Sequence, residues 1–93
     1  MIIGAATIKL YAPWVHSLKE KRMIVKSLID KTKNKFNTSI AEVEDQDVHQ
    51  IIVLGLACVT DSVSHANSMI DSILTFIEDN TEAEIIEVLR EIR

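Results

Sequence analysis

One segment that is apolar on both faces of a strand constrains the fold of this chain most. Residues 48–59 read Val-His-Gln-Ile-Ile-Val-Leu-Gly-Leu-Ala-Cys-Val, and they are apolar at odd and even positions alike after Gln50. Successive side chains of a strand point to opposite faces of the sheet, so this segment presents apolar groups on both faces. That pattern is typical of a strand in the middle of a sheet. We therefore expect a sheet with this segment at its centre.

Three other segments supply candidate partner strands. Residues 2–11 alternate with period two and are followed by Pro13, which cannot donate to a strand ladder. Residues 38–44 also alternate, with their acids on one parity, as in a half-exposed edge strand. Residues 82–93 fit either a helix or a strand by pattern. We prefer a strand, because it would pair beside residues 2–11 and leave no open edge there.

Two amphipathic helices separate these strands. Ser17 and Glu20 have the spacing of a capping box, and apolar residues then recur at helical spacing from Leu18 to Phe36. Thr60, Asp61 and Ser62 offer N-cap oxygens to a second helix, whose apolar positions run from residue 63 to 77.

The resulting order is β-α-β-β-α-β. A ferredoxin-like α+β sandwich satisfies it with right-handed crossovers, a four-stranded antiparallel sheet and two helices on one face. In that topology the first and third strands are central, which agrees with the doubly apolar third strand. The length of 93 residues leaves room for one domain, so we assign residues 1–93 to a single ferredoxin-like domain.

The composition of the chain indicates which stabilising sites and which cellular location to expect. A single cysteine excludes an internal disulfide framework and any multi-cysteine metal cage. The amino terminus has no basic segment before its apolar stretch, which Lys9 interrupts, so we expect neither a signal peptide nor a membrane span. A cytoplasmic protein without membrane contact is the expectation.

Positive charge is concentrated in the predicted first helix. The net charge is −4, but residues 1–40 hold eight Lys/Arg and two acids, while residues 41–93 hold two Arg and twelve acids. Cations at i, i+3, i+7 and i+14 form a stripe that can follow RNA phosphates, and the two aromatic residues before the helix can stack on bases. The candidate RNA contacts are Tyr11, Trp14, Lys19, Lys21, Arg22, Lys26 and Lys33. The alternative is a solvated helix face, with Trp14 closing the end of the core.

The second face of the sheet suggests self-association. Two helices cover only one face of four strands, which leaves an apolar face open, and such a patch usually marks an interface. The candidate residues of a homo-oligomer interface, most simply that of a dimer, are Ile3, Ala5, Thr7, Ile51, Val53, Ala57 and Val59. The alternatives are a mildly apolar solvent face, or a helical tail that covers it.

The chain contains no strong sequence motif for metal binding or catalysis. Asp45, Asp47 and His49 are two residues apart and would point to one side of an extended segment, where they could hold a divalent ion. The alternative is an acidic turn that enters a strand. No glycine-rich phosphate loop is present, and Cys58 lies inside an apolar strand. We therefore expect no enzymatic activity and no cofactor.

Two motifs resemble those of the YlxP-like family of small bacterial proteins, a domain of unknown function. They are the segments Ser17–Arg22 (SLKEKR) and Ile40–Asp47 (IAEVEDQD), together with Leu54-Gly55 and the Met1–Gly4 start. The resemblance runs to about residue 78 and implies a ferredoxin-like fold without established catalytic residues. Family members are often encoded beside translation-initiation and ribosome-maturation factors, which implies a ribosome-associated role. The acidic second half and Ile51 depart from the family pattern and favour self-association over RNA contact.

Overall fold

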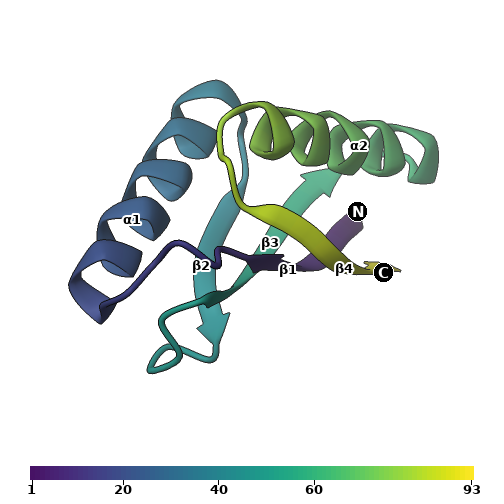
Figure 1. Cartoon of the computed structure of the whole chain (residues 1–93). Helices are drawn as coiled ribbons and strands as arrows, with labels where there is room; N and C mark the ends of the chain where they lie inside the picture. The colour runs from purple at the N-terminus through teal and green to yellow at the C-terminus, as the bar shows by residue number, and fades with distance from the viewer.

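The computed structural model covers residues 1–93 and has the order β-α-β-β-α-β. Its strands and helices are β1 (Ile2–Tyr11), α1 (Leu18–Lys35), β2 (Ser39–Glu44), β3 (Ile51–Thr60), α2 (Val63–Asp79) and β4 (Glu84–Ile92). The strands pair antiparallel in the order β2-β3-β1-β4, and both helices lie on one face of the sheet (Figure 1). The predicted ferredoxin-like sandwich is confirmed, and most of the ambiguous tail is a strand.

The core lies between the sheet and the two helices. β1 and β3 pair along their full length, from Ile2 opposite Thr60 to Tyr11 opposite Ile51. Their even-numbered residues face the helices and, apart from the terminal Ile2, are buried, as the sequence periodicity predicts. The helices contribute Val25, Leu28, Ile70, Ile73 and Ile77 to this core.

The helix starts follow the capping residues in the sequence. The Ser17 hydroxyl accepts a hydrogen bond from the Glu20 amide at 3.1 Å, and the Glu20 carboxylate accepts one from the His16 amide at 3.0 Å. Ser62 caps α2 in the same way, through the His65 amide at 3.1 Å. Neither helix is long and apolar enough to cross a membrane.

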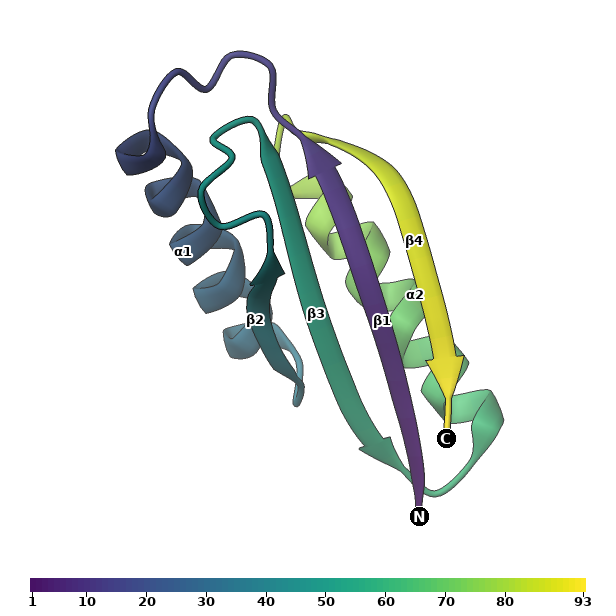
Figure 2. The same ribbon diagram turned by 90° about the horizontal axis from the view of Figure 1, so that it is seen from below.

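The opposite face of the sheet carries no helix. Figure 2 views the molecule from this side, with the four strands in front and both helices behind them. The odd-numbered residues of β1 and β3 point to this face, here called the open face, which no other element of the chain covers.

Candidate functional site

The exposed side of α1 gathers the cations that the sequence predicts there. Lys19, Arg22, Lys26 and Lys33 are all exposed and lie on the side of the helix away from the core. Lys26 Nζ pairs with Asp30 Oδ2 at 3.1 Å, while both side chains stay mostly in solvent. An exposed ion pair of this kind is weak, so the ammonium group of Lys26 remains accessible from solvent.

Lys21 does not belong to this surface, so its assignment as an RNA contact is wrong. Its side chain is 1% exposed, and its ammonium group donates to the carbonyl oxygens of Asp45 at 2.6 Å and Val48 at 2.8 Å. The same group lies 2.8 Å from Glu42 Oε2. A lysine enters a core only when acceptors surround its charge, and here α1 directs it to the β2–β3 connection, which supplies them.

The β2–β3 connection turns back on itself instead of running extended. Asp45 has a positive φ of 53°, and its carbonyl accepts from the Val48 amide at 3.0 Å. The extended geometry expected for a metal site at Asp45, Asp47 and His49 is therefore wrong, and no three His, Cys, Asp or Glu side chains gather in the structure closely enough to hold a metal ion.

The two aromatic candidates lie on different surfaces. Trp14 is 40% exposed and borders a shallow hollow beside α1, together with Met23 and Ser27. Tyr11 follows the buried Leu10 in the alternation of β1 and points to the open face. Trp14 therefore lies beside α1, in a hollow lined by none of its cations, whereas the grouping of Tyr11 with α1 is wrong because Tyr11 is on the other side of the sheet.

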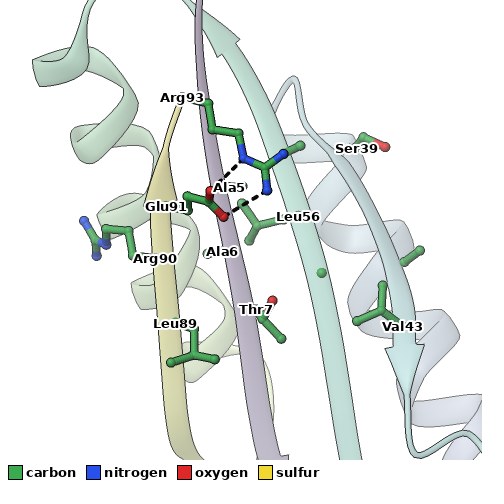
Figure 3. A pocket seen from close by; sticks show the side chains of 13 residues that line it. Ala5, Ala6, Thr7, Ser39, Val43, Leu56, Leu89, Arg90, Glu91 and Arg93 are labelled. Carbon is green, nitrogen blue, oxygen red and sulfur yellow. Dashed lines mark hydrogen bonds and ion pairs between the residues drawn. The ribbon is translucent and has the colours of Figure 1, made fainter.

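The open face is hollowed along its central strands. A shallow groove of about 590 Å³ has small residues on its floor, including Ala5, Thr7 and Ala57, while Val43 from β2 and Leu89 from β4 rise on either side (Figure 3). Gly55 also lies on the floor, and a Cβ there would come within 2.8 Å of Val43 Cγ1. The bare backbone of Gly55 thus lets Val43 lean over β3.

One predicted interface residue is not available on this face. Val53 is only 2% exposed, because the longer side chains of Lys9, Glu44, Glu87 and Leu89 gather around it. Ile3, Ala5, Thr7 and Ile51 are half-buried, and Ala57 is exposed. The prediction of Val53 as an interface residue is therefore wrong, because its side chain is buried within the single chain.

A surface ion pair closes one end of the groove. The Arg93 guanidinium donates two hydrogen bonds of 2.9 Å to the Glu91 carboxylate (Figure 3). These hydrogen bonds, and then the positive charge itself, lower the pKa of Glu91, and the same contacts raise the pKa of Arg93. The neighbouring Arg90 points to the helix side, where it pairs with Asp71 of α2 at 2.7 Å.

The residues that border the groove on its two sides and at its end were not predicted from the sequence. Leu89 and Arg93 lie in the tail whose state the pattern left ambiguous, and Val43 lies where the pairing of β2 with β3 shifts register between Glu42 and Glu44. For the tail, the alternation of a strand indicates that residues 89, 91 and 93 share one face of the sheet. No local pattern marks the irregularity in β2.

Fold and surface together define a ferredoxin-like α+β protein with one basic helix and an uncovered sheet face. The chain belongs to the family described as Protein of unknown function (DUF503), whose family model matches residues 3–90. It is 38% identical over 83 residues to Uncharacterized protein YlxP of Bacillus subtilis (strain 168), covering 89% of this chain and 90% of that protein. The predicted relationship to the YlxP-like family is confirmed.

Solved structures support the fold independently. The de novo designed protein LFR1 1 with ferredoxin fold matches all of this chain and 86% of its own, with a TM-score of 0.61 and 21% identity. The structural-genomics protein YJCS matches 96% of both chains, with a TM-score of 0.56 and 13% identity. At these identities the likeness establishes the architecture alone.

Proposed function

We propose that this protein is a non-catalytic binding module that contacts structured RNA, such as that of a ribosomal particle, through α1. The observation that carries the proposal is the exposed charge of this helix. Apart from the buried Lys21, α1 has six Lys/Arg, all exposed, against two acids. One of these acids, Glu20, is already engaged at the helix start by the His16 amide.

The spacing of these cations suits a phosphate backbone. Lys19 and Lys33 are fourteen residues apart, which at 1.5 Å per residue is about 21 Å along the helix. Arg22 and Lys26 lie between them on the same side. Cations in such a row neutralise successive phosphates and release counterions, so binding would weaken steeply as salt rises.

The rest of the molecule would restrict a polyanion to this helix. Outside α1 the chain has three Lys/Arg and twelve Asp/Glu. Repulsion from the acidic surfaces would orient RNA toward α1 and disfavour contact elsewhere. Trp14 then offers an aromatic surface at the start of the same helix for an unpaired base.

The test is a fluorescence-anisotropy titration of a labelled RNA hairpin at low and at physiological salt. We expect binding that falls steeply with salt, and its loss when Lys19, Arg22, Lys26 and Lys33 are all changed to Glu. Quenching of Trp14, the one tryptophan in the chain, gives a second readout. Unchanged binding by the fourfold variant would overturn the proposal.

Two single variants provide a matched control for nonspecific charge effects. Lys33→Glu and Lys9→Glu make the same change in net charge, but Lys33 is on α1 and Lys9 is on β1. We expect Lys33→Glu to weaken binding and Lys9→Glu to leave it nearly unchanged. Equal effects would mean that RNA responds to net charge alone and would contradict an α1 site.

A further inference from the structure

We infer that the open face of the sheet binds a second copy of this chain, forming a two-fold dimer whose α1 helices remain on the outside. The inference is independent of RNA binding, because α1 and the open face lie on opposite sides of the sheet (Figures 1 and 2).

The open face carries an apolar surface that no other part of the chain covers. Three large apolar side chains that the fold leaves exposed lie on this face: Val43 at 48%, Val59 at 67% and Leu89 at 61% exposed. Alanines and Gly55 fill the space between them. A continuous apolar patch on a small domain is typical of a protein interface.

The shape of the open face suits contact with an identical surface. Val43 and Leu89 project on either side of a shallow groove, and the floor between them consists of small residues such as Ala5 and Ala57 (Figure 3). In a two-fold interface the same patch must supply both the projections and the depressions that receive them. This face carries both, which makes it suited to pack against its own copy.

The area of the open face is sufficient for a weak dimer. Four strands spaced about 4.8 Å apart and rising about 3.4 Å per residue give a face of about 600 Å² per copy. Two copies would therefore bury about 1,200 Å² in total, at the lower end of the range for specific interfaces. We accordingly expect a concentration-dependent dimer instead of a permanent one.

Charged side chains lie at the two ends of the open face. Arg93 lies at the end near Ile3, to which it is joined by backbone hydrogen bonds, whereas Glu44 and Glu87 lie near Lys9 at the other end. Two copies stacked with their strands in opposite directions place the Arg93–Glu91 pair of each copy toward Lys9, Glu44 and Glu87 of the other, so that charges of both signs meet at each end. The apolar centre and charged rim are the usual anatomy of an interface.

The test is the mass of the protein by sedimentation velocity over a range from micromolar to millimolar concentration. We expect the mass to rise from that of one 10.5 kDa chain toward that of two. Val59→Glu and Leu89→Glu should keep the chain monomeric, with an unchanged circular dichroism spectrum. Leu89→Met, which preserves an apolar side chain, should still dimerise.

Val63→Glu is the matched control. Val63 is 50% exposed at the start of α2, away from the open face. Its replacement by Glu introduces the same side chain as Val59→Glu does. We expect it to dimerise like the parent protein. A parent chain that stays monomeric at the highest concentration would overturn the inference, as would a mass above two chains or a dimer that resists both Val59→Glu and Leu89→Glu.

Discussion

The ammonium group of Lys21 lies 2.8 Å from Glu42 Oε2, and this buried pair joins α1 to β2. Lys21 also donates to two carbonyl oxygens of the β2–β3 connection. Glu42 Oε2 is buried and accepts no well-directed hydrogen bond, so the charge of Lys21 is its main compensation. The contact unites the two sequence motifs that carry the family resemblance, since Lys21 belongs to the first and both Glu42 and Asp45 belong to the second.

Removing the charge of Lys21 should destabilise the fold. Lys21→Met leaves the Glu42 carboxylate and the Asp45 and Val48 carbonyls without their partner, and loss of one member of a buried pair costs about 3–5 kcal/mol. Urea unfolding measures the change in free energy. Lys19→Met is the control, because Lys19 is exposed on the same helix and should shift stability by less than about 0.5 kcal/mol.

A double variant separates the ion pair from packing. Replacing Lys21 and Glu42 together with Met and Leu removes both charges, and such replacements are often neutral. We expect it to recover much of the stability that Lys21→Met loses. Equal losses for Lys21→Met and Lys19→Met would show that the buried contact contributes nothing.

The sequence predicts the fold well because periodicity reports which face of each element is buried. The same periodicity also places position 21 on the buried side of α1, four residues before Val25. The residue type instead indicates an exposed position, because lysine is rarely buried unless it is paired. Its acceptors are 24 and 27 residues away in a turn, and no local pattern contains that information.

The candidate surfaces were predictable only in part, for a similar reason. Alternation identified the open face correctly, but it could not show that Lys9, Glu44 and Glu87 cover Val53. Side chains from three strands meet there, and their lengths decide exposure. Likewise, Tyr11 is close to α1 in sequence, yet the direction of its side chain follows the pleat of β1.

Gly55 should tolerate no side chain while Val43 leans over it. In Gly55→Ala the new Cβ would meet Val43 Cγ1 at 2.8 Å, so the half-exposed Val43 side chain must shift and the free energy of unfolding should fall. The double variant Gly55→Ala, Val43→Ala removes the obstructing methyl groups. We expect a favourable coupling energy of at least about 0.5 kcal/mol between the two changes in a urea-unfolding cycle. Strictly additive effects would contradict a steric conflict between position 55 and Val43.

The salt dependence of RNA binding should report the number of phosphates that α1 contacts. Loss of one phosphate contact reduces the slope of log K against log salt by about 1. We expect this reduction for Lys33→Gln in anisotropy titrations at several salt concentrations. Lys21→Met should leave the slope unchanged in any protein that remains folded, because its ammonium group is buried. A reduced slope for Lys21→Met would place that lysine at the RNA after all.

Arg93 should control the titration of Glu91. Its guanidinium lowers the pKa of Glu91 in the folded chain, first by hydrogen bonding and then by charge. A lowered folded-state pKa means that the pair favours folding above the ordinary pKa of glutamate, about 4.3, and that this contribution disappears as pH falls through the folded value. In an NMR titration of the Glu91 carboxyl carbon, Arg93→Gln should move the midpoint back up to that ordinary range. Arg90→Gln should not, since Arg90 pairs with Asp71 on the helix side, and identical midpoints in the parent and Arg93→Gln proteins would refute the contact.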